Sequence, residues 1–252
     1  MFDKSKWITS RNESTNILIF RKSFHINKQI SKAILRISGL GFYDALLNNT
    51  RFEQCYFKPI VSDYKYRKSF YYAKRNDEYF AYFNVYDLTN LIKEDNVLEV
   101  QVSTGYFHNL DKKDFNNVDY GKNRLIFELE VTFEDGSKEA ISSDENTLVA
   151  VSKNKSNFWL GDRVYFNKET LNFSKSEVLN EKINLRESPI KSDEVIDVYD
   201  GKLVKHDTNY YMFDFGVNHT GRLSGVIKGR KNQNILIKFG EFLEEDGSLN
   251  LK

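Results

Sequence analysis

The chain contains very little cysteine and very little proline. Cys55 is the only cysteine among 252 residues, so no disulfide can form within the chain. No flanking pattern marks Cys55 as a nucleophile or a metal ligand, and we expect it to be a small buried apolar residue. The two prolines suit sheets whose strands need uninterrupted backbone donors.

The chain also lacks long apolar runs and an excess of charge of either sign. The first residues are charged and no apolar core region follows them, so they do not form a secretory signal. No stretch approaches the length of a membrane span, and the sequence therefore predicts a cytoplasmic protein with no membrane partner. Its 37 basic and 36 acidic residues give a net charge of +1, which provides no long-range field for binding nucleic acid.

The dominant pattern in the sequence is an alternation of apolar and polar residues. It is clearest over residues 125–133 and recurs at 98–102 and 33–37, as expected for half-buried strands. The Asp-Gly pair at 135–136 and the Asn-Asn pair at 48–49 predict hairpin turns, because these residues tolerate positive φ. Many short strands joined by such turns indicate a sandwich.

Signals for helices are few. Residues 87–93 predict a short helix of about two turns, which an Asp or Thr would cap. Aromatic residues make up 15% of the chain, and Phe and Tyr favour pleated, half-buried surfaces. The sequence therefore predicts an all-β protein.

A domain boundary is predicted near residue 188. The preceding segment, about 168–184, is polar and weakly periodic, as a connector would be. The two predicted domains are residues 1–188 and residues 189–252. Within the second domain we expect a hairpin over 195–205 and strands over 210–215, 223–228 and 234–239.

Two segments near the end of the chain carry a recognisable pattern. Residues 213–221 read FDFGVNHTG and residues 239–247 read FGEFLEEDG. This pattern resembles the β-rich region that precedes the catalytic domain of bacterial α-L-rhamnosidases. Earlier landmarks follow in the family's order, at residues 20–24, 33–48, 86–92, 96–98, 105–107, 134–137, 143–144 and 161–165. Two positions depart from it, since Asn49 stands where a glycine is usual and Tyr165 stands where an aspartate is usual.

The resemblance implies a fold and a role. The fold would be a jelly-roll or galactose-binding-like β-sandwich, followed by a second, smaller and incomplete β-sandwich unit. In the family these units precede an (α/α)-barrel that carries the catalytic acids, so a barrel domain is expected C-terminal to this chain. The chain would then be a non-catalytic N-terminal portion that supports the barrel, is inactive alone, and meets rhamnose-containing glycosides or oligosaccharides through the parent enzyme. The alternatives are a free-standing carbohydrate-binding module and a small hydrolase that uses Asp214 and Glu241.

No catalytic residue is assigned, but four residues of the two signature segments are candidates for contacting carbohydrate: Asp214, Asn218, His219 and Glu241. By alternation, Glu241 would share an apolar face with Ile235, Ile237 and Phe239. A carboxylate on such a face needs a partner, which Arg222 or Asn218 would supply, or a place at the solvated end of the strand. We expect these carboxylates to fix loops rather than to react.

No cofactor is predicted, and a calcium site is the alternative to that prediction. Oxygen-bearing side chains gather within residues 111–119, but their spacing departs from the helix–loop–helix calcium template, and a solvated loop is favoured. The four histidines are scattered and show no zinc-type spacing. The calcium candidates are Asp111, Asp114, Asn116, Asn117 and Asp119.

Aromatic residues offer a further route to sugar binding, because the C–H face of a pyranose suits the face of an aromatic ring. A place in the core is the favoured interpretation for them. The aromatic candidates are Trp7, Tyr106, Phe107, Tyr120 and Trp159.

An unpaired strand edge at the end of the chain would promote association into a homo-oligomer.

Overall fold

The structure is a computed structural model in which most of the chain is described. The described residues are 2–12, 16–53, 55–62, 80–105, 108–109, 118–119, 121–156, 162–165, 169–190, 194–230 and 232–250. They form two compact units, Met1–Glu194 and Val195–Lys252. The boundary expected after residue 188 stays a prediction.

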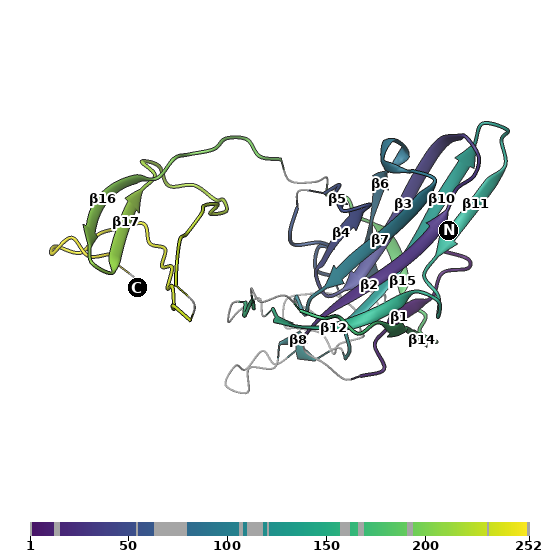
Figure 1. The fold of residues 1–252 in the computed structure, drawn as a ribbon, viewed down its shortest axis with the longest axis horizontal. Coiled ribbons are helices and arrows are strands. Elements are labelled where there is room, and N and C mark those ends of the chain that lie inside the picture. Colours follow the sequence, from purple (N-terminus) through teal and green to yellow (C-terminus); the bar gives the residue numbers. More distant parts are fainter. Residues whose placement is uncertain are drawn as a thin grey trace, which may run out of the picture. The chain divides into compact units, whose positions relative to one another are not determined.

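The first unit is built from two main sheets, which form the layers seen in Figure 1. In the first sheet the strand order is β14-β1-β10-β3-β6-β15, with β11 also paired to β10. Neighbours in this sheet are antiparallel except for β15, which runs parallel to β6. Its strands are β1 (Trp7–Thr9), β3 (Ile30–Leu40), β6 (Phe80–Asp87), β10 (Arg124–Phe133), β11 (Lys138–Ser142), β14 (Glu177–Leu179) and β15 (Asn184–Glu187).

The second sheet has the order β13-β12-β2-β7-β4-β5 and is antiparallel throughout. Its strands are β2 (Asn16–His25), β4 (Tyr43–Leu47), β5 (Thr50–Arg51), β7 (Asp95–Val102), β12 (Leu148–Lys155) and β13 (Ser174–Lys175). A separate short pair joins β8 (His108–Asn109) to β9 (Val118–Asp119). The all-β class is therefore confirmed.

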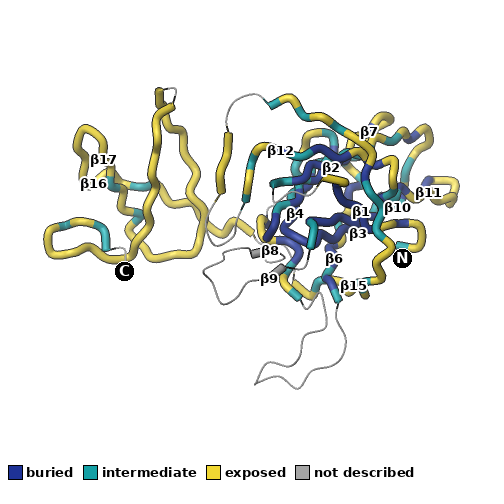
Figure 2. Tube along the Cα trace, turned by 90° about the horizontal axis from the view of Figure 1, so that it is seen from below, coloured by how far each residue is buried: buried dark blue, intermediate teal, exposed yellow. Residues whose placement is uncertain are grey.

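The main core lies between the two sheets, where Figure 2 shows the buried part of the chain. The alternating residues of β3 and β10 point into it: Leu35, Ile37 and Leu129 are all fully buried. Phe20 and Leu98 enter it from the second sheet. The period-two pattern thus marked the core face correctly, because successive side chains of a strand point to opposite faces.

A smaller apolar cluster contains side chains of the first sheet outside the main core. Trp7, Leu40, Ala81 and Ile126 are buried there, beneath partly buried residues that include Leu179 and Leu185. The predicted connector is thus not a plain linker: it contains the short strands β13 and β14, and β15 begins at its last residue. Strands of two to four residues take their order from backbone pairing with a neighbour, and they are too short to show an alternation.

The predicted turns are present. Asn48 and Asn49 both adopt positive φ, 53° and 63°, between β4 and β5, as a tight hairpin requires. In the predicted Asp-Gly turn at residues 135–136, only Gly136 has a positive φ, 79°. The helix predicted over residues 87–93 was too long, since only a 3-10 turn, η1 (Thr89–Leu91), forms there.

The longest described hairpin of the second unit joins β16 (Lys202–Asp207) to β17 (Tyr210–Asp214). The strand predicted over 210–215 is therefore confirmed, but the hairpin predicted within 195–205 is wrong, because the turn lies at 208–209. The strands predicted over 223–228 and 234–239 are also wrong. Alternation becomes a strand only where a neighbouring strand pairs with it.

Among the described residues, no helix has the length and the apolar character that crossing a membrane would require.

Candidate functional site

The first signature segment forms a turn at the end of β17. The carboxylate of Asp214 accepts a hydrogen bond of 2.8 Å from the backbone N–H of Gly216. Gly216 has a φ of +76°, a region that side chains with a Cβ rarely adopt. The aspartate therefore stabilises the turn, in agreement with the expectation that it fixes a loop.

His219 lies in the same segment, beside two aromatic rings. Its ring centroid is 4.9 Å from that of Tyr199 and 6.0 Å from that of Phe215. Its Nδ1 is 3.0 Å from the carbonyl oxygen of Val217. The second unit thus carries a small cluster of rings next to Asp214, in which Tyr199 and His219 are exposed and Phe215 is half-buried. The sequence did not predict that Tyr199 joins this cluster.

Asn218 and Glu241 are exposed. Glu241 does not lie on a buried apolar face, because Ile235, Ile237 and Phe239 are themselves between 49% and 72% exposed. It directly precedes a small hairpin bridged by Leu243 and Leu249. The predicted buried carboxylate was therefore wrong, since the alternation on which it depended does not form a strand.

A polar cluster that the sequence did not reveal lies in the first unit. The hydroxyl group of Tyr43 donates 2.8 Å to Oδ1 of Asn84 and lies 2.9 Å from the hydroxyl group of Tyr86. Burial raises the pKa of both tyrosines, so both stay neutral and act as hydrogen-bonding groups. Next to them Lys58 pairs with Glu53 at 3.0 Å.

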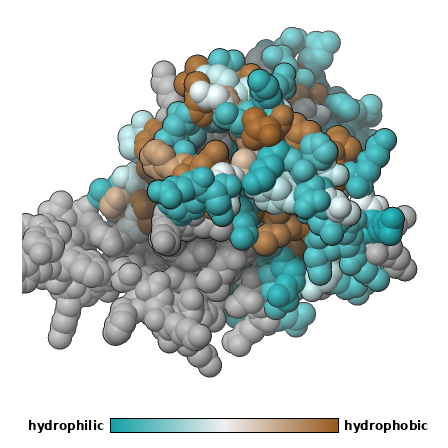
Figure 3. Space-filling model, turned by 90° about the vertical axis from the view of Figure 1, so that its left-hand side faces the viewer, coloured by the Kyte–Doolittle hydropathy of each residue, from teal (hydrophilic) through white to brown (hydrophobic). Residues whose placement is uncertain are grey.

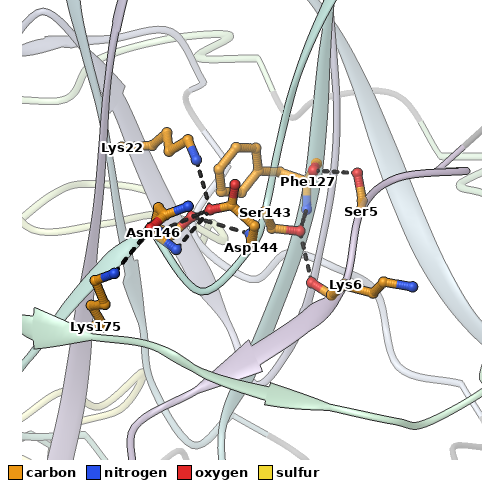
Figure 4. A network of polar contacts seen from close by, with 9 residues as sticks. Ser5, Lys6, Lys22, Phe127, Ser143, Asp144, Asn146 and Lys175 are labelled. Carbon is orange, nitrogen blue, oxygen red and sulfur yellow. Dashed lines mark hydrogen bonds and ion pairs between the residues drawn. The ribbon is translucent and has the colours of Figure 1, made fainter.

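A second polar network holds the loop that follows β11, as Figure 4 shows. Asp144 accepts from the ammonium group of Lys22 at 2.6 Å and from the backbone N–H groups of Asn146 and Thr147. Ser143 accepts from the N–H of Phe127 and donates to the carbonyl of Lys6. These bonds satisfy buried or half-buried groups within the fold, and they serve to hold the chain in place.

Metal binding finds no support in the described part of the chain, where no group of three or more His, Cys, Asp or Glu side chains is placed to hold an ion. The side chains of the calcium candidates between residues 111 and 119 lie outside the described residues. Among the four histidines, His25 forms a hydrogen bond with the carboxylate of Asp95.

Of the aromatic residues considered for sugar stacking, Trp7 is 3% exposed and belongs to the core. Tyr106, Phe107, Tyr120 and Trp159 lie outside the described residues. Cys55 is buried and not in a disulfide, as predicted.

Comparison with known proteins gives matches to several α-L-rhamnosidases. A curated α-L-rhamnosidase of Formosa agariphila is 23% identical over 90% of this chain, and the chain spans 25% of that relative's length. The solved α-L-rhamnosidase of "Dictyoglumus thermophilum" has a TM-score of 0.60 at 21% identity, over 84% of this chain and 25% of that one. That of Aspergillus terreus has a TM-score of 0.57 at 23% identity, over 72% of this chain and 22% of that one.

The solved structure of the Streptomyces avermitilis α-L-rhamnosidase, complexed with L-rhamnose, also has a TM-score of 0.57, at 22% identity, over 67% of this chain and 16% of that one. At such identities these likenesses show the fold. The family model described as the alpha-L-rhamnosidase N-terminal domain matches residues 28–209, which is most of the chain. This chain therefore belongs to the α-L-rhamnosidase N-terminal domain family.

Proposed function

We propose that this chain acts as the non-catalytic N-terminal portion of an α-L-rhamnosidase-like glycoside hydrolase. In this role it supports an (α/α)-barrel catalytic domain and contacts rhamnose-containing glycosides. Membership of the family supports the proposal, as do relatives that are about four times as long as this chain. A cytoplasmic location is part of the same proposal.

The observation that carries the supporting role is the exposed apolar surface of the second unit. Ile196, Val226, Leu236 and Phe239 are 97%, 93%, 79% and 72% exposed. Figure 3 shows hydrophobic side chains lying among hydrophilic ones on one face of the molecule. Extensive exposed apolar surface commonly marks an interaction site, whereas the first unit buries most of its large apolar side chains in its own core.

Two measurements test this role. The purified 252-residue chain should not hydrolyse an aryl α-L-rhamnoside, and turnover by the pure chain would overturn the proposal. Alone, the chain should bind a hydrophobic dye and associate in light scattering, because its apolar surface lacks a partner. The double variant Val226→Lys and Phe239→Lys should reduce both signals. An unchanged signal would remove the second unit as the docking surface.

The alternative is a free-standing carbohydrate-binding module. The observation that favours it is the cluster of Tyr199, Phe215 and His219 beside Asp214, in which Tyr199 and His219 are exposed. Titration with L-rhamnose should then shift the NMR signals of these residues, and His219→Ala should weaken binding. The binding module is the better description if L-rhamnose shifts these NMR signals, if the chain hydrolyses no rhamnoside, and if a barrel domain has no effect on the chain.

A further inference from the structure

Residues 55–62, which we name the edge strap, run between the two sheets of the first unit. The backbone N–H of Tyr43, in β4, donates to the carbonyl of Lys58 at 2.7 Å. The hydroxyl group of Ser62 donates to the carbonyl of Phe80, in β6, also at 2.7 Å. The strap is therefore fixed to one strand of each sheet.

A buried ion pair anchors the strap from the inside. Lys58 and Glu53 have side chains only 4% and 5% exposed, and their charged groups are 3.0 Å apart. The second carboxylate oxygen of Glu53 accepts from the backbone N–H of Cys55. Burying two charges is costly even when they pair, so this anchor contributes geometric definition more than net stability.

Two consecutive residues of the strap expose aromatic rings. Tyr56 is 43% exposed and Phe57 is 56% exposed. Each ring is supported by a neighbour. The guanidinium carbon of Arg51 lies 3.7 Å from the centroid of the Tyr56 ring. Phe42 packs edge-on against Phe57, with the two ring centroids 5.3 Å apart. The rings are thus exposed and held in place at the same time.

Hydrogen-bonding groups lie next to the Tyr56 ring. Nε of Arg51 donates to Oδ1 of Asp44 at 2.8 Å, and the two side chains keep 26% and 39% of their surface exposed. A carboxylate has acceptor sites beyond the one that this bond uses. Asp44 can therefore accept from a ligand hydroxyl while it remains paired with Arg51.

The strap thus combines a costly buried ion pair with exposed aromatic rings, two features that folding alone does not favour. Local departures of this kind concentrate at functional sites, and binding groups work best when a rigid inner layer holds them. We propose that Tyr56 and Phe57, here named the aromatic ledge, bind the apolar C–H face of a pyranose ring. Asp44 would accept hydrogen bonds from the hydroxyl groups of the sugar. The inference rests on the carbohydrate contact proposed above, and a deoxyhexose such as L-rhamnose suits it because its methyl group adds apolar surface.

The test is a titration of the full 252-residue chain with L-rhamnose and with methyl α-L-rhamnoside, followed by NMR. The variants are Tyr56→Ala, Phe57→Ala and their double variant, with Tyr56→Phe retaining the ring. Tyr211→Ala is the matched control, because Tyr211 is an exposed tyrosine, 63% exposed, in the second unit. Loss of one ring should weaken binding about threefold to tenfold. Tyr56→Phe and Tyr211→Ala should bind like the unaltered chain, and circular dichroism checks that every variant is folded.

The outcomes separate this inference from the proposed function. Binding that His219→Ala abolishes and the ledge variants leave intact would overturn the aromatic ledge while keeping the carbohydrate contact. If the unaltered chain binds no sugar at all, both the ledge and the carbohydrate contact are overturned, whereas the supporting role remains. If the ledge variants are folded and bind the sugar more weakly, while the control variants bind it normally, the result supports the aromatic ledge.

Discussion

The ammonium group of Lys22, in β2, lies 2.6 Å from the carboxylate of Asp144, which is 122 residues further along the chain. The same carboxylate oxygen accepts the backbone N–H groups of Asn146 and Thr147. One side chain therefore both shapes the turn between β11 and β12 and ties that turn to a neighbouring strand (Figure 4).

Replacement of Asp144 should consequently lower stability. Asp144→Ala removes four acceptor contacts, the fourth being with the hydroxyl group of Thr147, and we expect the free energy of unfolding to fall by about 1–3 kcal/mol. Asp144→Asn keeps an oxygen for the turn but loses the charge, so its loss should be smaller. Urea unfolding followed by circular dichroism measures both. Equal losses for the two variants would mean that the turn contacts contribute nothing.

The pair formed by Glu53 and Lys58 predicts a different pattern. Glu53→Leu leaves the buried Lys58 without its carboxylate, which should cost about 3–5 kcal/mol. The double variant Glu53→Leu and Lys58→Met removes both charges and should recover much of that loss. Chemical denaturation of the single and double variants tests this coupling. A double variant that loses the full sum of the two single losses would contradict it.

Gly41 should not tolerate a side chain. It has a φ of +122°, and a Cβ there would lie 1.9 Å from the carbonyl oxygen of Ser103. Gly136 is the matched control, because it also has positive φ, +79°, but a Cβ would meet no atom within 4 Å. Gly136→Ala should cost about 1–2 kcal/mol from the backbone conformation alone, and Gly41→Ala should cost clearly more. Thermal melts of the two variants decide, and similar melting temperatures would refute the steric argument.

The pH dependence of stability should include a contribution from His25. Its hydrogen bond with Asp95 raises its pKa above the ordinary value of 6.5, and the charges of Asp95 and Glu94 act in the same direction. Because the folded pKa is the higher one, this contribution is fully present below pH 6.5 and is lost as the pH rises through the folded pKa. An NMR titration of the His25 ring should give a midpoint above 6.5, and Asp95→Asn should lower it. A midpoint that Asp95→Asn leaves unchanged would assign the shift to another cause.

Calcium binding by residues 111–119 is the alternative hypothesis for this segment, and a melting experiment tests it. The sequence favours a solvated loop there, so we expect melting in calcium chloride and in a chelator to coincide. A higher melting temperature in calcium that the chelator reverses would instead assign a bound ion.

The sequence by itself determined the all-β class and the core faces of the long strands. In β3, β7 and β10 the alternation extends over enough residues to show which side is buried, because the pleat sends successive side chains to opposite faces. The asparagine pair at 48–49 likewise marked its turn, since the requirement for positive φ is local. The family signature at 213–221 could also be recognised in the sequence alone, and the turn that it forms depends mainly on Asp214 and Gly216.

Only the tertiary structure decided the rest. The short strands β13, β14 and β15 exist because a neighbouring strand pairs with them, whereas the alternating residues at 223–228 and 234–239 have no such pairing and form no strand. The polar cluster of Tyr43, Asn84 and Tyr86 joins β4 to β6, which belong to different sheets, and the hydrogen bonds of the edge strap join the same two strands. Contacts of this kind depend on how the two sheets stack, and local sequence does not encode which residues then meet.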